Sequence, residues 1–247
     1  MAIERSESRS TEQKRETRIE TKFYDYAEGS CLVSFGRTKV LCVATVEENV
    51  PPHLRGKGQG WVTAEYSMLP RSSPDRIRRE RTNVGGRTQE IQRLIGRALR
   101  SVTRTEYIGE RTIMLDCDVL QADGGTRTAS VTGAFVALVQ ALHHLAKINK
   151  ISTTNPFPIS DFVSAISVGM VKEQPVLDLD YKEDSSAETD MNLVMTRGGK
   201  IIEIQGTAER DPFSQEQLSS MLKLGQKGCV ELCQLQESVL GPLQWRK

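Results

Sequence analysis

The sequence lacks the features of several protein classes. Its 247 residues include three histidines and five scattered cysteines, with no Cys-x-x-Cys pair and no cluster suited to structural zinc. No run approaches the roughly 18 apolar residues of a membrane span. Charged residues are spread through the first twenty positions, where a secretory signal would have an apolar core. The cysteines at 31, 42 and 117 lie in apolar alternation, as reduced thiols do. We therefore expect a cytoplasmic protein with no membrane partner.

The sequence also lacks a strong net charge, but its value of +1 conceals two regions of opposite sign. Residues 71–104, the basic block, contain ten arginines and three acidic residues; residues 173–190, the acidic block, contain seven acidic residues and one lysine. This separation suggests a polyanionic ligand near the basic block and a metal or acid–base site at the acidic block. Alternatively, the two blocks neutralise each other across the fold or between subunits.

Hydrophobic patterning predicts one α+β domain, because strand groups are followed by helices and no Pro/Gly/Ser-rich linker divides the chain. Alternation predicts a hairpin or meander over 17–47, strands over 61–68, 111–120, 162–172 and 175–181, and a hairpin over 190–206. Apolar residues at helical spacing predict helices over 88–104, 129–147 and 214–238. Ser214 and Gln217 form the capping box of the last helix.

The segment 121–130, between a predicted strand and a predicted helix, has the composition of an anion-binding loop. Gly124 and Gly125 allow a sharp turn and a close backbone approach. The following helix directs unpaired N–H groups and a positive dipole end at the loop. Arg127 adds a planar set of donors suited to phosphate. The alternative is a plain loop with an N-capping threonine and a surface arginine.

The acidic block offers carboxylates for chemistry. Asp178 and Asp180 share one face of the strand predicted over 175–181, and Asp184 lies one turn beyond. Neighbouring carboxylates either bind a divalent cation, here Mg²⁺ or Mn²⁺, or retain a proton and serve as an acid. The alternative is an exposed acidic loop. Together with the anion loop and the basic block, the carboxylates suggest chemistry on a phosphodiester with phosphate as a bound reactant.

Four strings closely resemble the bacterial members of the ribonuclease PH family. They lie at 60–71, 86–97, 115–130 and 183–192, and the likeness extends over about 27–224. The resemblance implies the single-domain RNase PH fold, a βαβα arrangement shared with domain 2 of ribosomal protein S5. It implies a divergent N-terminal segment over 1–16, a catalytic domain over 17–238 and a short C-terminal tail over 239–247.

The resemblance implies a phosphorolytic 3′-to-5′ exoribonuclease, also called a tRNA nucleotidyltransferase. Such an enzyme trims the 3′ ends of tRNA precursors, with ribosomal RNA as a further candidate substrate. It uses inorganic phosphate, releases nucleoside 5′-diphosphates and acts reversibly. The implied assembly is a homohexamer, a trimer of dimers. Two alternatives remain: a catalytically silent RNA-binding ring subunit of the same fold, and a metal-dependent hydrolase.

The resemblance also assigns roles to residues at matching motif positions. Phosphate binding falls to Arg87, Gly125, Thr126 and Arg127. The catalytic carboxylates are Asp178 and Asp184, which are also the candidate ligands of Mg²⁺ or Mn²⁺; either one can be the acid or the ligand. RNA binding falls to Arg71, Arg76 and Arg79, which are expected to grip the RNA backbone without reading its sequence.

The N-terminus departs from the family pattern. Family members begin with an Arg-x-Asp-Gly-Arg string and a Leu-Arg-Pro segment, whereas residues 9–16 here read Arg-Ser-Thr-Glu-Gln-Lys-Arg-Glu. We expect this difference to affect strand-edge or subunit contacts rather than the chemistry. The segment 240–247 has no assigned role.

Overall fold

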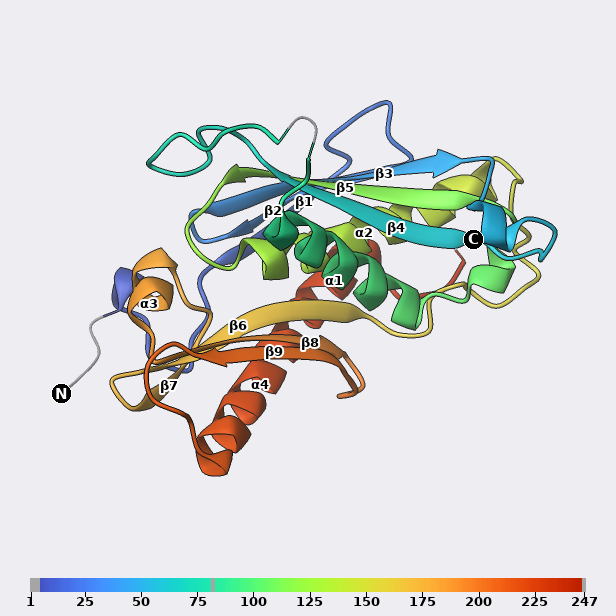
Figure 1. Cartoon of the computed structure of the whole chain (residues 1–247). Helices are drawn as coiled ribbons and strands as arrows, with labels where there is room; N and C mark the ends of the chain where they lie inside the picture. The colour runs from blue at the N-terminus through green and yellow to red at the C-terminus, as the bar shows by residue number, and fades with distance from the viewer. Residues whose placement is uncertain (1–4, 81–82, 246–247) are drawn as a thin grey trace.

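The chain folds into two sheets separated by two helices, with a further helix on the outer face of the second sheet (Figure 1). The computed structural model describes residues 5–80 and 83–245. Arg81 of the basic block lies outside the described residues, as do positions 1–4 and 246–247 of the predicted terminal segments. Short 3₁₀ helices occur at Ser6–Ser8, Pro52–Leu54 and Thr105–Tyr107.

The first sheet has five strands in the order β1-β2-β3-β5-β4. Their bounds are Thr17–Thr21 (β1), Gly29–Phe35 (β2), Thr38–Glu47 (β3), Trp61–Met68 (β4) and Thr112–Gln121 (β5). Only the β4–β5 pair is parallel, because α1 connects these two strands as a crossover. The strands predicted over 17–47, 61–68 and 111–120 are confirmed.

Two helices fill the space between the sheets. α1 (Gly86–Val102) packs against β4, and α2 (Thr126–Lys147) packs against both β3 and β6. α2 is long and apolar enough to cross a membrane, but 78% of its apolar window is buried inside the fold, so it serves as the core helix. α2 begins at Thr126 rather than at the predicted position 129, which places Thr126 and Arg127 in its first turn.

The second sheet has four antiparallel strands in the order β7-β6-β8-β9. They are Val163–Val171 (β6), Gln174–Leu177 (β7), Thr189–Thr196 (β8) and Ile201–Ala208 (β9). The long helix α4 (Gln215–Leu240) packs on β6, β7 and β8, and its predicted capping box of Ser214 and Gln217 is present. The mixed helix and strand content confirms the predicted α+β class.

The prediction of a strand over 175–181 was wrong beyond residue 177. β7 ends at Leu177, and Asp178 adopts a left-handed backbone conformation with φ of 56°. Asp180 then caps the short helix α3 (Tyr181–Ser186), accepting backbone hydrogen bonds from Lys182 and Glu183. Aspartate tolerates the left-handed region and is a preferred N-cap, so the acidic residues that alternate in the sequence end the strand instead of extending it. Asp178 and Asp180 therefore do not share a strand face.

Candidate functional site

The loop between β5 and α2 turns through two glycines in the left-handed conformation. Gly124 and Gly125 have φ of 76° and 67°, and Gly125 is the N-cap of α2. A Cβ atom on Gly124 would lie 2.6 Å from the carbonyl oxygen of Leu179, so only glycine allows this approach. The loop therefore packs directly against the segment that leads into α3 (Figure 1). The first turn of α2, with its unpaired N–H groups, lies at this junction.

The predicted phosphate-binding residues come from the first turns of two helices. Arg87 is an exposed residue of α1, and Thr126 and Arg127 begin α2. The positive charges of Arg87 and Arg127 both act on the Asp184 carboxyl and on the Tyr66 hydroxyl. The two arginines therefore lie near the same two groups. Arg127 Nη1 also donates to Gln205 at 3.1 Å and contacts Glu90 at 3.4 Å.

Tyr66 extends from the inner face of β4 toward Thr126 at the start of α2. Its hydroxyl lies 2.9 Å from the Thr126 Oγ1 atom, and burial raises the pKa of the Tyr66 phenol. A neutral tyrosine hydroxyl can donate to Thr126 and leave the threonine proton free to turn toward an anion. Sequence reasoning did not select Tyr66, although it lies in the string 60–71 and alternates into the sheet interior with Val62 and Ala64.

Two carboxylates with raised pKa values lie opposite the arginines. Burial raises the pKa of Asp184 on α3, although Arg127 and Arg87 oppose that shift. Burial, followed by the charge of Asp184, raises the pKa of Asp190 on β8 to about 6. The Asp190 Oδ1 atom is buried and has no hydrogen-bond partner within residues 5–80 and 83–245. Asp184 and Asp190 therefore form a pair in which full ionisation is unfavourable.

Sequence reasoning counted Asp190 in the acidic block but did not select it as a site residue. A signal was available, because Asp190 and Asn192 are two positions apart on a strand and share a face. The Asn192 amide lies 3.4 Å from the Asp190 Oδ2 atom.

Asp178 occupies a different position from Asp184. It is fully buried, and Arg15 binds both of its oxygens, with Nη2 to Oδ1 at 2.7 Å and Nε to Oδ2 at 3.0 Å. The Arg15 backbone N–H donates to Oδ2 at 2.7 Å. Burial alone would raise the pKa of Asp178, but the ion pair with Arg15 outweighs it and lowers the pKa. The structure thus brings Asp184 to Arg87 and Arg127, and it holds Asp178 as the partner of Arg15. A catalytic or metal-binding role for Asp178 stays a prediction.

Two further arginines of the N-terminal segment are buried against the acidic block. Arg5 Nε donates to Glu183 at 2.6 Å, and its Nη2 donates to the Leu177 carbonyl at 2.7 Å. Arg9 Nη1 donates to the Asp178 carbonyl at 3.0 Å. The N-terminal segment therefore contacts the acidic block directly. The expectation that its departure from the family pattern affects strand-edge or subunit contacts rather than the chemistry stays a prediction. These arginines, rather than the basic block, neutralise Asp178, Asp180 and Glu183.

A sequence signal for the N-terminal arginines existed. Arg5 and Arg9 have the spacing of the two arginines in the family's Arg-x-Asp-Gly-Arg string, with Ser6-Glu7-Ser8 between them. Ser8 stands where that string has glycine, and its φ is 53°. The string is therefore altered at its centre but keeps both arginines, whose buried contacts lie more than 160 positions away in the chain.

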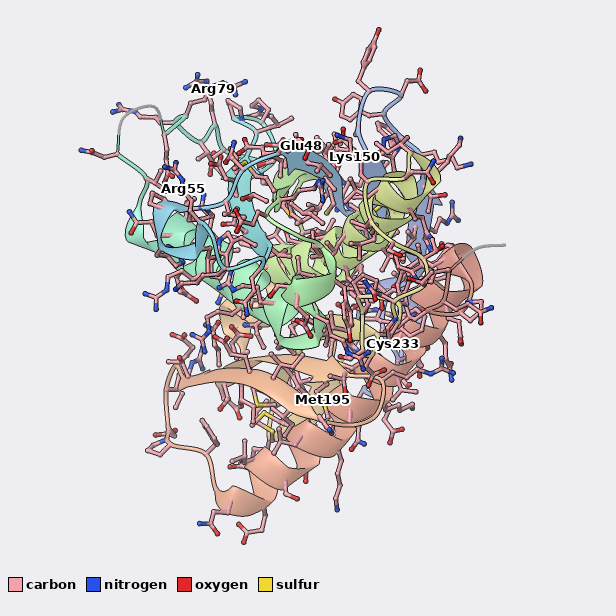
Figure 2. All side chains as sticks on the ribbon, turned by 90° about the vertical axis from the view of Figure 1, so that its right-hand side faces the viewer. Glu48, Arg55, Arg79, Lys150, Met195 and Cys233 are labelled. Carbon is pink, nitrogen blue, oxygen red and sulfur yellow. The ribbon has the colours of Figure 1, made fainter. Side chains whose placement is uncertain are left out.

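The predicted RNA-binding arginines lie in the segment between β4 and α1. Arg71, Arg76 and Arg79 are all exposed. The segment is anchored beside the anion loop, because the Ser72 carbonyl accepts a hydrogen bond from the Ala122 N–H at 2.7 Å. Figure 2 shows Arg79 at the rim of the first sheet, remote from Met195 and Cys233 in the second layer. The segment that carries the three arginines is thus joined to the start of the anion loop.

Comparison with known proteins agrees with this geometry. The family model described as 3′ exoribonuclease family, domain 1, matches residues 13–142, and domain 2 of the same family matches residues 161–228. Ribonuclease PH of Neisseria meningitidis serogroup C is 55% identical over 235 residues, covering 94% of this chain and 96% of that protein. Ribonuclease PH of Moorella thermoacetica is 53% identical over 244 residues, covering 98% and 96%.

Solved structures with the same fold are more distant in sequence. The crystal structure of rice (Oryza sativa) Rrp46 superposes with a TM-score of 0.76 at 17% identity, covering 96% of this chain and 100% of that one. The Archaeoglobus fulgidus exosome with RNA bound to the active site gives a TM-score of 0.77 at 17% identity, covering 92% and 91%. These likenesses confirm the RNase PH fold.

The two family models that match this chain define its class, the 3′ exoribonucleases. Within that class the chain belongs to the ribonuclease PH family. It is a phosphorolytic 3′-to-5′ exoribonuclease with inorganic phosphate as co-substrate, as predicted. The alternative of a catalytically silent ring subunit is not favoured, because relatives at this identity are themselves ribonuclease PH.

Proposed function

We propose that this chain trims the 3′ ends of tRNA precursors, binding phosphate between the first turns of α1 and α2. The observation that supports this most is that Arg87 and Arg127 both act on the Asp184 carboxyl, and that Arg127 also acts on the neighbouring Asp190 carboxyl. The Gly125 N-cap leaves the first N–H groups of α2 available to an anion, and Thr126 adds a hydroxyl. Phosphate held there is oriented as a nucleophile, which lowers the entropy cost of the reaction.

In the proposed step, a phosphate oxygen forms a bond to the phosphorus of the terminal phosphodiester. The bond from that phosphorus to the 3′ oxygen of the preceding nucleotide breaks, and the departing oxygen takes up a proton. A carboxyl pair that shares one proton has one member to donate it and one to bind a cation. We assign the donor to Asp184, because burial raises the pKa of its carboxyl even against the opposing charges of Arg127 and Arg87. Asp178, paired with Arg15, acts on the position of this segment and does not transfer the proton.

A divalent cation fits the remaining carboxylate. Within the part of the chain that the structure describes, no group of three or more His, Cys, Asp or Glu residues could hold a metal. Mg²⁺ commonly binds through one or two carboxylates with phosphate and water completing its shell, and Mn²⁺ accepts the same ligands. The unpaired Oδ1 atom of Asp190 would be the ligand, with Asp184 as its neighbouring carboxylate. When bound, the ion would neutralise negative charge on the departing oxygen.

The exposed arginines Arg71, Arg76 and Arg79 would hold the RNA backbone as it approaches the site. They lie on a segment anchored to the anion loop through Ser72 and Ala122, so RNA bound to them would pass close to that loop. Contacts of this kind neutralise phosphates and carry no base specificity.

We also propose a cytoplasmic homohexamer built as a trimer of dimers. The support is the ribonuclease PH resemblance and the fold shared with the Archaeoglobus fulgidus exosome. Sedimentation should give a mass about six times the 27.6 kDa of one chain. A monomer or dimer at micromolar concentration contradicts this assembly.

Product analysis of a 3′-extended tRNA precursor, with and without phosphate, tests the proposed reaction. We expect shortening only with phosphate, and nucleoside 5′-diphosphates as the products. Equal shortening without phosphate, or release of monophosphates, would contradict it. Asp184→Asn should retain RNA binding while turnover falls by about 10²–10⁴-fold, the usual contribution of a general acid. Glu188→Gln, a neighbouring acidic position outside the proposed site, is the matched control.

A further inference from the structure

The guanidinium of Arg15 joins the two segments that meet at the site. Arg15 is 2% exposed, and its side chain binds both oxygens of Asp178, just after β7. The same side chain donates from Nη1 to the Asp123 carbonyl at 2.5 Å, and its Nη2 lies 3.4 Å from the Gly124 carbonyl. One buried residue thus contacts both the entrance to α3 and the loop before α2.

The anion loop is held from one side by its carbonyl groups. Besides Arg15, the Thr38 hydroxyl donates to the Gly124 carbonyl at 2.7 Å and accepts from the Asp123 N–H at 2.8 Å. With these carbonyls fixed by Arg15 and Thr38, the N–H groups at the start of α2 are directed elsewhere, toward the position of an anion. Two left-handed glycines have wide conformational freedom, so the loop gains order from such anchors.

The ion pair with Asp178 offsets much of the positive charge that Arg15 brings to the site. Arg127 and Arg87 accordingly act on the Asp184 carboxyl more strongly than Arg15 does. A Cβ atom built on Gly125 would lie 3.0 Å from Arg15 Nη2 and 3.9 Å from Asp178 Oδ1, so the pair is adjacent to the N-cap. A shift of Arg15 would therefore move the loop. It would also leave the negative charge of Asp178 without its partner beside that loop.

We propose that Arg15 is a positioning residue for the phosphate reactant. It fixes the Gly124–Gly125 loop through two carbonyls. The start of α3, which carries Asp184, is held by Arg5 and Arg9 as well as through Asp178. The inference rests on the proposed phosphate position at α2, and it assigns a role in phosphate binding to the N-terminal segment.

Arg15→Lys is the variant that tests the proposal. Lysine keeps a positive charge for Asp178, but a single ammonium group cannot reproduce the planar contacts to Asp178 and both carbonyls. We expect KM for phosphate to rise about tenfold, kcat to stay within about threefold and the Kd for RNA to remain unchanged. Thr38→Val, which removes the second anchor of the same loop, should change KM for phosphate in the same direction.

Arg5→Lys is the matched control. Arg5 is a buried arginine of the same N-terminal segment. Its hydrogen bonds go to Glu183, to the carbonyls of Leu177 and Asp178 and to carbonyls of its own segment, and none goes to the anion loop among the described residues. It should lower Tm as Arg15→Lys does and leave KM for phosphate near the wild-type value. If both variants lower Tm and neither changes KM for phosphate, Arg15 has a structural role only and the proposal is overturned.

Direct phosphate binding separates this proposal from the one on which it rests. Inorganic phosphate should raise the Tm of the wild type, because a ligand that binds only the folded state stabilises it. The Arg15→Lys variant should require about tenfold more phosphate for the same increase. If phosphate does not raise the Tm of the wild type, the proposed phosphate position is contradicted. If phosphate raises the Tm of wild type and Arg15→Lys equally, only the role of Arg15 is contradicted.

If Arg15→Lys does not fold, the double variant Arg15→Gln/Asp178→Asn replaces it. This variant removes both charges while keeping polar groups of similar size, so no carboxylate remains buried without a partner. A raised KM for phosphate supports the proposal, and a wild-type KM overturns it.

Discussion

The two arginine-rich regions of this molecule have similar residues and opposite environments. Arg5, Arg9 and Arg15 of the N-terminal segment are buried and bind carboxylates and carbonyls. Arg71, Arg76 and Arg79 of the basic block are exposed. A buried arginine is fixed by its partners and shapes the site, whereas an exposed one keeps its donors available to a polyanion. Arginine content alone therefore does not identify the ligand-binding region.

The largest expected difference between the two regions is in stability. Arg15→Ala leaves the Asp178 carboxylate buried without its partner, which typically costs about 3–5 kcal/mol in the free energy of unfolding. Arg76→Ala removes an exposed side chain and should change it by less than about 0.5 kcal/mol. Urea denaturation of both variants measures this contrast. Equal effects would mean that burial does not distinguish the two regions.

The acidic residues also differ between two positions, and the pH dependence of stability tests this difference. The pKa of Asp178 is lowered by Arg15, while burial and Asp184 raise the pKa of Asp190 from 3.8 to about 6. The pKa of Asp190 is higher in the folded state than in the unfolded state. Asp190 therefore contributes fully to the free energy of unfolding below about pH 4, and this contribution is lost as the pH rises through about 6. Asp190→Asn should therefore gain stability relative to wild type over that interval, by up to about 3 kcal/mol without divalent cations.

Urea titrations at several pH values, with and without Mg²⁺, measure the Asp190 effect. Mg²⁺ should stabilise the wild type and reduce its deficit relative to Asp190→Asn, because the ion relieves the repulsion between Asp184 and Asp190. A stability difference that is independent of pH would contradict the raised pKa of Asp190.

The exposed region should control RNA affinity and its salt dependence. Replacing Arg76 and Arg79 together by alanine should weaken RNA binding and reduce the slope of log K against log salt by about 0.7 for each RNA phosphate that is no longer neutralised. KM for phosphate should stay near wild type, the reverse of Arg15→Lys. Fluorescence anisotropy across a salt series provides the measurement. An unchanged slope would show that these two arginines do not neutralise RNA phosphates.

The smallest expected effect concerns the centre of the N-terminal segment. Ser8 has φ of 53°, in a region that glycine adopts without steric strain. Ser8→Gly should raise the free energy of unfolding by about 0.5 kcal/mol, since the strain removed exceeds the entropy that glycine adds to the unfolded chain. Thermal unfolding beside Ser10→Gly, a nearby position without positive φ, is the comparison. A lower Tm for Ser8→Gly would show that Ser8 is not strained.

Most helices and strands were predictable because their signals are local. The alternation in β4 and the capping box of Ser214 each depend on a few neighbouring residues. The strand predicted over 175–181 failed because Asp178 turns into the left-handed region and Asp180 caps α3, a choice set partly by Arg15 and Arg5. Those partners are more than 160 positions away, beyond any periodicity.

The candidate site was predictable to a similar extent. The anion loop could be read from two glycines before a helix, and the structure brings Arg87 and Arg127 to Asp184. The pairing of Asp190 with Asp184 could not be read, because α3 and β8 are separate elements whose approach depends on the fold. The acidic block as a sequence feature contains two kinds of carboxylate, and only their partners in space tell them apart.

Arg127 is proposed to hold the phosphate reactant rather than RNA, and the roles proposed for Arg15 and the anion loop depend on this assignment. A comparison of KM for phosphate and Kd for RNA between wild type and Arg127→Ala tests it. We predict that KM for phosphate rises at least about tenfold while Kd for RNA changes by less than about twofold. A Kd for RNA that rises by about tenfold with an unchanged KM for phosphate would contradict the assignment.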